Sequence, residues 1–184
     1  LAEVKNPSAL FLSERGEPAP GSVVFSGIEG SRPVLCEFQA LVSPSPTPQA
    51  RRTVVGWDGS RLAMILAVLE SRAGIPFTGL DVYLNVAGGL RVSEPAADLA
   101  VAAALVSARE DSAIPKDCVV FGEISLSGAL RSVSQTENRL KEAQKLGFST
   151  AIMPKGDKAP STAGLTAKRY DDLTAFVGDI FGAG

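Results

Sequence analysis

Histidine is absent from this sequence of 184 residues. Its absence excludes the Ser-His-Asp and Cys-His forms of nucleophilic catalysis and every metal site that needs an imidazole ligand. Cysteine is scarce as well, because Cys36 and Cys118 are too few for a four-cysteine zinc site. Each lies among apolar residues, so we expect two reduced thiols in the core of a cytoplasmic protein. A single disulfide between them is the alternative.

Long hydrophobic runs and a surplus of charge are also missing. No apolar run reaches the roughly 18–20 residues of a membrane-spanning helix, so we expect no membrane partner. The start, Leu1 to Lys5, lacks a charged region followed by an apolar stretch and predicts no signal peptide. The 18 basic and 20 acidic residues give a net charge of −2. This balance excludes a globally basic nucleic-acid binder but allows a local basic face.

The composition that remains is typical of one ordered domain. Hydrophobic residues make up 45% of the chain, which is enough for a real core. Residues 1–20 are polar and contain three prolines, so we expect an N-terminal arm or linker, with one helical turn at 6–12. The chain begins without methionine, and we expect it to be part of a longer protein. Residues 21–184 then form the domain itself.

Hydrophobic periodicity predicts alternating strands and helices along this domain. A hairpin over 21–42 comes first, with turn residues at 29–31. Apolar residues at helical spacing predict helices at 60–73, 95–109, 136–146 and 171–181. Strands are predicted at 51–56, 81–86, 119–124, 130–133 and 150–153. A β-rich first third followed by alternating elements favours an α+β fold, a two-layer or mixed α/β sandwich with an N-terminal β-hairpin.

Two segments have unusual patterns. Residues 43–48 place proline at every second position, which predicts an exposed, stiff loop that is either a connector or a docking site for a partner. The helix predicted at 95–109 is apolar on all sides between Leu99 and Val106, so it must be largely buried.

No nucleotide-binding or acid–base motif is evident. Gly88-Gly89 precedes a helix, but the GxGxxG and GxxxxGK[ST] patterns are absent, so turn glycines are favoured over a phosphate-binding loop. Glu94 and Asp98 flank the start of the helix at 95–109, where each negative charge is favourable by about 0.3–1 kcal/mol. We interpret them as helix N-terminal charges, and Glu123 as an edge or turn carboxylate.

Basic side chains form two modest groups. The first lies in and around the helix at 60–73 and consists of Arg51, Arg52, Arg61 and Arg72. The second, diluted by Glu137 and Glu142, consists of Arg131, Arg139, Lys141 and Lys145. Each group is either a solvated surface or a phosphate-contacting one, and the adjacent pair Arg51-Arg52 is the stronger candidate. Trp57 nearby is either a base-stacking residue or a core residue.

Four segments carry a family resemblance. They are residues 6–13, residues 41–42 with 51–56, residues 88–100 and residues 120–128. In this order they resemble the C-terminal domain of the RadA (Sms) family of bacterial DNA-repair proteins. That domain is similar in fold to the proteolytic domain of Lon protease, so the resemblance implies a Lon-like sandwich for nearly the whole chain.

The Lon comparison also implies where catalytic residues would lie. Lon peptidases use a Ser-Lys dyad, and their serine opens a helix within a Gly-Pro-Ser-Ala-Gly element. The matching stretch here, 94–98, has Ala96 at the serine position, and the lysine position falls on Glu137. A methyl group cannot attack a carbonyl, so the resemblance implies a degenerate site with no catalytic residue. A peptidase using Ser93 with Lys141 as base is the alternative.

The resemblance implies a scaffold for an ATPase. Family members carry a zinc finger and a RecA-like ATPase ahead of this domain, so ATP, Mg and Zn are expected only upstream and no cofactor here. We expect a homo-oligomer, as a hexameric ring, that contacts single-stranded or branched DNA in recombinational repair, with a recombinase as a further partner. The DNA-contact candidates are Arg51, Arg52, Arg61, Arg72, Arg91 and Arg131. A pure protein-interaction module that uses the proline-rich loop is a third hypothesis.

Overall fold

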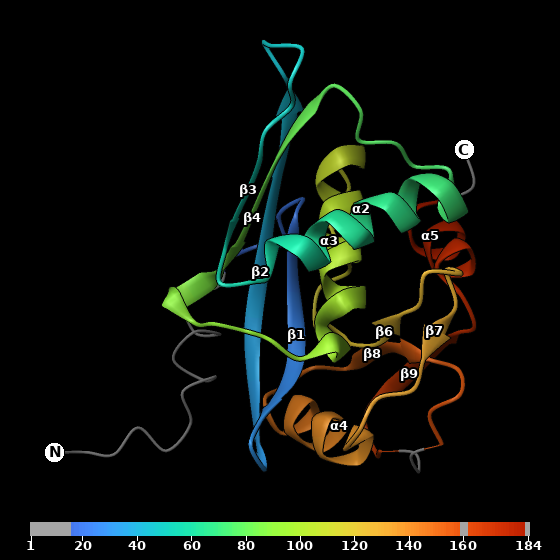
Figure 1. Cartoon of the computed structure of the whole chain (residues 1–184). Coiled ribbons are helices and arrows are strands. Elements are labelled where there is room, and N and C mark those ends of the chain that lie inside the picture. Colours follow the sequence, from blue (N-terminus) through green and yellow to red (C-terminus); the bar gives the residue numbers. More distant parts are fainter. Residues whose placement is uncertain (1–15, 159–161, 183–184) are drawn as a thin grey trace, which may run out of the picture.

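A mixed β-sheet of seven strands organises the fold (Figure 1). The computed structural model describes residues 16–158 and 162–182, so the helical turn predicted at 6–12 and most of the arm at 1–20 lie outside the described residues. The strands of the sheet are β1 (Ser22–Glu29), β2 (Arg32–Pro44), β3 (Arg52–Val55), β4 (Leu80–Val86), β5 (Cys118–Val120), β8 (Thr150–Pro154) and β9 (Thr166–Tyr170). They pair in the order β3-β4-β2-β1-β5-β8-β9.

The remaining elements are a two-stranded ribbon and the helices. The ribbon pairs β6 (Glu123–Ile124) with β7 (Leu130–Arg131) in antiparallel register. The helices are α2 (Gly59–Ala73), α3 (Asp98–Glu110), α4 (Thr136–Lys145) and α5 (Leu173–Phe181), with the short 3₁₀ helices η1 (Ala87–Gly89) and η2 (Pro95–Ala97). In the described ranges, no helix has the length and apolar character needed to cross a membrane.

The predicted hairpin is confirmed, and its strands are longer than expected. Glu29 pairs with Arg32, so Gly30 and Ser31 alone form the turn. Gly30 takes a left-handed conformation (φ 65°) that glycine adopts without strain. β2 also pairs antiparallel with β4, whereas β3–β4, β1–β5, β5–β8 and β8–β9 pair in parallel. A mostly parallel sheet combined with helices confirms the mixed α/β class.

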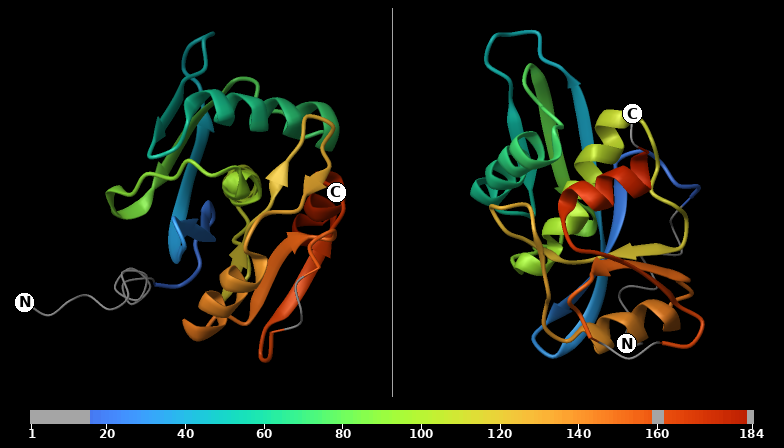
Figure 2. Two further views of the ribbon diagram at one scale, coloured as in Figure 1. Left: turned by 60° about the horizontal axis from the view of Figure 1, so that its bottom comes forward. Right: turned by 90° about the vertical axis from the view of Figure 1, so that its right-hand side faces the viewer.

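The core lies between the sheet and a group of helices. Helices α2, α3 and α5 pack against one another, and α3 lies along β1 and β2 (Figures 1 and 2). Residues 99–106 of α3 are buried on every side, as their apolar sequence predicts. Trp57 is also in this core, where its ring meets Phe38 edge-on at a centroid distance of 5.6 Å. The ring is therefore enclosed by protein and is a core residue, not a base-stacking one.

Cys36 in β2 and Cys118 in β5 are both free and buried, so the prediction of core thiols is confirmed over the disulfide. Burial raises the pKa of each thiol to about 12. The nearby carboxylate of Glu94 adds to this effect at Cys36.

Two element boundaries differ from the prediction because of local backbone geometry. The strand predicted at 119–124 is interrupted at Gly122, whose φ of 154° is rare for residues with a side chain. As a result β5 ends at Val120 and β6 begins at Glu123. The helix predicted at 95–109 begins one turn later as an α-helix, because η2 precedes α3.

Two further differences concern polar or proline-containing strands. The sequence pattern gives no sign of β9, because residues 166–168 are all exposed and show no apolar alternation. β2 continues through Pro44, which pairs with Leu80, so the proline-rich loop is shorter than the predicted 43–48. Proline has no N–H for a ladder, but β1 pairs with β2 only as far as Gln39, so Pro44 has a paired strand on one side alone and occupies an edge position.

Candidate functional site

The segment that the Lon comparison singles out is the start of α3. Ala96 lies in η2 and is 5% exposed. Its carbonyl accepts a hydrogen bond from Gly122 N at 2.7 Å, and Gly122 O in turn accepts from Leu99 N at 3.0 Å. The break between β5 and β6 therefore holds the start of α3 in place. An added Cβ at Gly122 would lie 3.0 Å from Pro154 Cγ, so this close approach requires glycine.

An ion pair between a buried arginine and a largely buried carboxylate lies immediately before this segment. The guanidinium of Arg139 donates to both carboxylate oxygens of Glu94, with Nη1–Oε1 and Nη2–Oε2 distances of 3.0 Å. Oε1 of Glu94 also accepts from Ile28 N at 2.8 Å. The pair thus joins three parts of the chain: the β1–β2 hairpin, the segment before η2, and α4.

Arg139 is 1% exposed, and all its nitrogens have partners. Its Nε donates to Ser134 O and its Nη1 to Ser26 O, both at 2.9 Å. Its Cζ lies 5.9 Å from the ring centroids of both Phe25 and Phe121. These contacts compensate for the cost of removing the charge from water. An unpaired buried cation would have no such compensation.

The sequence interpretation of Arg139 as a surface cation is therefore wrong, and that of Glu94 as a simple helix-start charge is incomplete. One signal was available. In the sequence, Arg139 lies four residues before Ala143 and seven before Leu146, which is the spacing of one helix face. Arg139 thus occupies an inward position of the helical repeat, where a surface cation does not belong.

A second buried carboxylate, Asp98, anchors the first turn of α3. It is 1% exposed and accepts from Arg61 Nε at 2.5 Å, from Arg61 Nη2, and from Ile124 N at 3.0 Å. Burial raises the pKa of Asp98, while the bonds from Arg61 and Ile124 partly offset this shift. Asp98 raises the pKa of Arg61 in return. Glu123 lies 4.0 Å from the same guanidinium and is partly exposed, as predicted.

A third buried carboxylate, Asp157, was not singled out from the sequence. It lies after β8, is 6% exposed, and accepts from Val133 N at 3.3 Å. Burial raises its pKa, and hydrogen bonds from Thr136 and Val133 partly offset the shift. Asp157 therefore fixes the loop that leads into α4.

The predicted lysine position holds a carboxylate instead of the amine that a Ser-Lys dyad needs. Glu137 is half exposed in the first turn of α4, and its Oε1 lies 2.8 Å from Lys141 Nζ. Ser93 is exposed in the segment between η1 and η2. Ser93 and Lys141 share no hydrogen bond within the part of the chain that the structure describes, so the alternative nucleophile and base are not assembled as a pair.

The arginines predicted to contact DNA are spread over several parts of the fold. Arg52 is in β3, and its guanidinium donates to the carbonyls of Arg51, Leu80 and Phe77. Arg61, in α2, is committed to Asp98. The other four are exposed, and their side chains have no recorded hydrogen-bond or ion-pair partner among the described residues: Arg51, Arg72, Arg91 and Arg131. These four are therefore available to a ligand, whereas Arg52 and Arg61 already have intramolecular partners.

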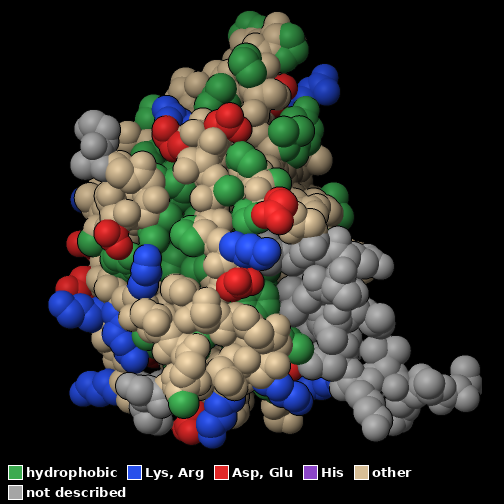
Figure 3. Space-filling model, turned by 180° about the vertical axis from the view of Figure 1, so that it is seen from behind, with side chains coloured by type: hydrophobic (Ala, Val, Ile, Leu, Met, Phe, Trp, Pro, Cys, Tyr) green, Lys and Arg blue, Asp and Glu red, His purple; other side chains and the backbone are tan. Residues whose placement is uncertain are grey.

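The surface shows no strongly basic face in the view from behind. Lys and Arg side chains there are interspersed with Asp and Glu (Figure 3). Such mixing agrees with the net charge of −2, and it means that any DNA contact on this face is local.

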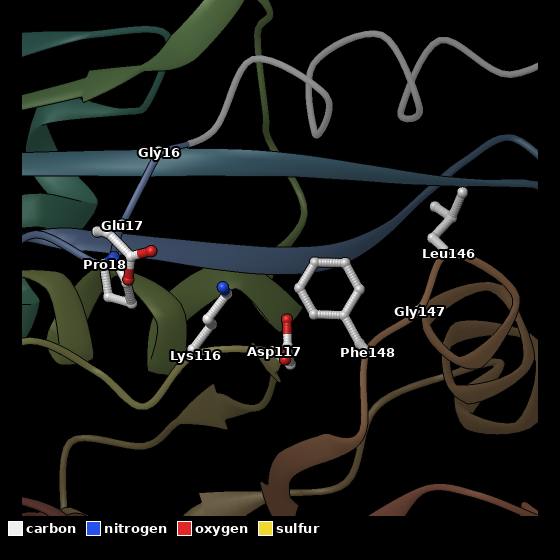
Figure 4. Close-up of a pocket in the computed structure, with 8 residues that line it drawn as sticks. All are labelled: Gly16, Glu17, Pro18, Lys116, Asp117, Leu146, Gly147 and Phe148. Carbon is white, nitrogen blue, oxygen red and sulfur yellow. The ribbon is translucent and has the colours of Figure 1, made fainter.

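Two hollows away from α2 contain charged side chains. One, of about 280 Å³, lies between the β1–β2 hairpin and residues 90–94, with Arg91, Ser93 and Glu94 on its wall. The other, of about 440 Å³, lies where the described chain begins, with Glu17, Lys116 and Asp117 around it (Figure 4). Within the described ranges, no group of three histidine, cysteine or acidic side chains is placed to hold a metal ion.

Comparisons with known proteins agree with the resemblance. The family model described as Subunit ChlI of Mg-chelatase matches residues 60–157. The chain is 67% identical to the DNA repair protein RadA of Brucella abortus (strain 2308) over 156 residues, which are 85% of this chain and 33% of that protein. It is 54% identical to the DNA repair protein RadA of Rickettsia bellii (strain RML369-C) over 157 residues, 85% of this chain and 35% of that protein.

A more distant match extends further along the chain. The DNA repair protein RadA of Synechocystis sp. (strain ATCC 27184 / PCC 6803 / Kazusa) is 51% identical over 165 residues, 90% of this chain and 33% of that protein. The chain thus spans about a third of the length of these curated relatives and matches their C-terminal part. The predicted resemblance to RadA proteins is confirmed.

Proposed function

Since the chain belongs to the family whose model is described as Subunit ChlI of Mg-chelatase, and resembles the C-terminal part of RadA proteins, we propose that it is a non-catalytic scaffold domain acting in DNA repair. It supports oligomerisation and DNA contact for an ATPase encoded in the same protein. Residues 21–184 form a Lon-like domain, and residues 1–20 form the linker from the ATPase. ATP, Mg and Zn belong to upstream domains, and the protein acts in the cytoplasm.

The observation that carries this proposal is the bonding around the start of α3. Ala96 has no nucleophilic atom, and its carbonyl is bound to Gly122 N. Glu94 and Asp98 on either side are each neutralised by an arginine. Carboxylates held this way are not free to act as general bases, whereas they do fix the relative positions of α2, α3 and α4. The arrangement supports a structural role better than peptide hydrolysis.

The DNA contact is assigned to the arginines that have no intramolecular partner. Arg51, Arg72, Arg91 and Arg131 can each neutralise a phosphate without breaking a bond in the protein. Arg52 and Arg61 are expected to act indirectly, since they hold β3 and α3 in place.

Titration of a labelled single-stranded oligonucleotide and a labelled four-way junction, at several salt concentrations, tests this assignment. The binding constant falls as salt rises, and the slope of its logarithm against the logarithm of salt concentration reports the number of phosphate contacts. Each Arg→Ala variant that removes one contact should lower the magnitude of this slope for single-stranded DNA by about 0.7. Lys141→Ala is the matched control, because Lys141 is exposed and pairs with Glu137. Binding that is absent at low salt, or equal slopes for all five variants, would remove DNA contact from the proposal.

Oligomerisation and the peptidase alternative need separate measurements. We expect analytical ultracentrifugation of the longer protein to show a hexamer, and removal of residues 21–184 to lower the oligomer number. A monomer in both cases would contradict the scaffold.

The peptidase alternative is tested by incubating the chain with a fluorogenic casein. Hydrolysis that is lost in Ser93→Ala but kept in Ser71→Ala would establish the peptidase instead.

A further inference from the structure

Strand β3 is an open edge of the sheet (Figure 1). Only alternate residues of a parallel strand turn their N–H and C=O groups towards a given neighbour. Val82 N donates to Arg51 O at 2.9 Å, so Arg51, Thr53 and Val55 turn these groups towards β4. The N–H and C=O groups of Arg52 and Val54 therefore point away from the sheet. They form a short template for one more strand.

A cleft runs along one face of this edge, between β3 and α2. Its volume is about 280 Å³, at the lower limit of the roughly 300–1,000 Å³ typical of small-molecule sites. Buried apolar side chains form its floor: Leu62, Leu66 and Phe77. Along α2 the wall is formed by Ala63 and Ala67, whose short side chains leave the cleft open, and the charged side chains of Arg52 and Glu70 line its rim. This space suits one or two apolar side chains better than a cofactor.

The opposite face of the same edge is also apolar and uncovered. Leu41 is 62% exposed and Val55 is 56% exposed. Leu41 pairs with Tyr83, and Tyr83 with Thr53, so this exposed row extends from β2 across β4 to β3. A strand added beside β3 would place alternate side chains on the two faces and would cover apolar surface on both.

The charges next to β3 indicate which kind of segment would pair with this edge. The guanidinium of Arg51 has no recorded partner among the described residues, and Arg51 directly precedes β3. A carboxylate on the incoming segment would pair with it. The other edge of the sheet, β9, carries Lys168 and Arg169, so β9 of a second copy would bring like charges together. β9 of a second copy is therefore a poorer complement for this edge than an acidic segment of another protein.

We propose that the β3 edge and the β3–α2 cleft form a docking site for an extended, acidic peptide segment of a partner protein. The segment pairs with the outward N–H and C=O groups of Arg52 and Val54, inserts an apolar side chain between β3 and α2, and places a carboxylate at Arg51. PDZ and PTB domains bind peptides by this mode of strand addition. The remaining proline-rich loop leads into β3 and borders the same site.

A synthetic peptide tests the proposal with the 184-residue chain. The probe is fluorescein-labelled Asp-Glu-Leu-Thr-Val-Thr-Leu-Thr, with a Pro-for-Val version that cannot continue a ladder. We expect the first peptide to raise fluorescence anisotropy and to slow hydrogen exchange of the Arg52 and Val54 amides, and the second to do neither. Binding without protection of these two amides, or no binding, would overturn the proposal.

Matched variants measure the contributions of the cleft and of the Arg51 charge to peptide binding separately. Ala67→Trp fills the cleft and should weaken peptide binding at least tenfold, whereas Met64→Trp, on another face of α2 beside Leu126, should leave it unchanged. Arg51→Glu should weaken the acidic peptide and strengthen a lysine-containing one, with Arg72→Glu as control. Equal losses of peptide affinity in a variant and its control would contradict the proposed docking site. So would protection of Arg52 and Val54 by a single-stranded oligonucleotide instead of by the peptide.

Discussion

Glu94 and Arg139 face each other across 45 positions of sequence, with both carboxylate oxygens bound to one guanidinium at 3.0 Å. Glu94 directly precedes η2, and Arg139 is on the inward face of α4. The comparison with Lon protease expects a serine two residues after Glu94 and a lysine two residues before Arg139. In this chain an ion pair holds the segment before η2 against α4 close to those positions.

Removing only one partner of this ion pair should strongly destabilise the fold. Arg139→Met leaves the Glu94 carboxylate without its counter-charge, and we expect the free energy of unfolding to fall by about 3–5 kcal/mol. Urea denaturation followed by circular dichroism measures the change. The double variant Glu94→Gln/Arg139→Met removes both charges and should recover part of the loss. A double variant as unstable as the sum of the single ones would mean that the two residues are not coupled.

Asp98 should matter for stability more than exposed aspartates do. Asp98→Asn weakens the bonds from Arg61 and Ile124 N, and we expect a loss of about 2–3 kcal/mol. Asp111→Asn is the matched control, because Asp111 is exposed, follows α3 and has a left-handed backbone that asparagine also tolerates. It should change the stability by less than about 0.5 kcal/mol. Similar values for the two variants would show that the Asp98–Arg61 pair contributes little.

Both thiols should be unreactive in the native protein. Their pKa values of about 12 leave almost no thiolate at about pH 8, so a disulfide reagent should modify them only after denaturant is added. Rapid modification of the native chain would contradict this expectation.

The same thiols imply a loss of stability at high pH. The folded pKa is raised above the ordinary value of 9.0, so below about pH 9 both states are protonated and the contribution is complete. Between about pH 9 and about pH 12 the unfolded state ionises first, and the free energy of unfolding should decrease. Cys36→Ala/Cys118→Ala should show a shallower decrease than the parent chain in urea titrations over this window.

Gly122 should not accept a side chain. Its φ of 154° and the 3.0 Å approach of a Cβ to Pro154 Cγ predict that Gly122→Ala lowers the free energy of unfolding by about 1–3 kcal/mol. Gly178→Ala in α5 is the control, since no atom lies within 4 Å of its Cβ position. It should raise the stability by about 0.5–1 kcal/mol through better helix propensity. Thermal unfolding of the two variants distinguishes these opposite signs.

Much of the fold follows from local patterns. The apolar run at 99–106 predicts a buried helix, and the structure confirms it. Turn residues at 29–31 predict the hairpin that joins β1 and β2. By contrast β9 is polar, and its position depends on pairing with β8, which no periodicity within residues 166–170 could reveal. The break at Gly122 likewise depends on Pro154 and Leu99, which are distant in sequence.

The sequence by itself determined which chemistry is absent: it has no imidazole and too few thiols for a four-cysteine zinc site. These are properties of residue type, which folding cannot change. Only the tertiary structure decided which charges are free. Arg139, Arg61 and Arg52 look like surface cations in the sequence, yet each is bound to groups from another part of the chain. A charge leaves water only where the folded chain brings partners to it, and that proximity exists only in three dimensions.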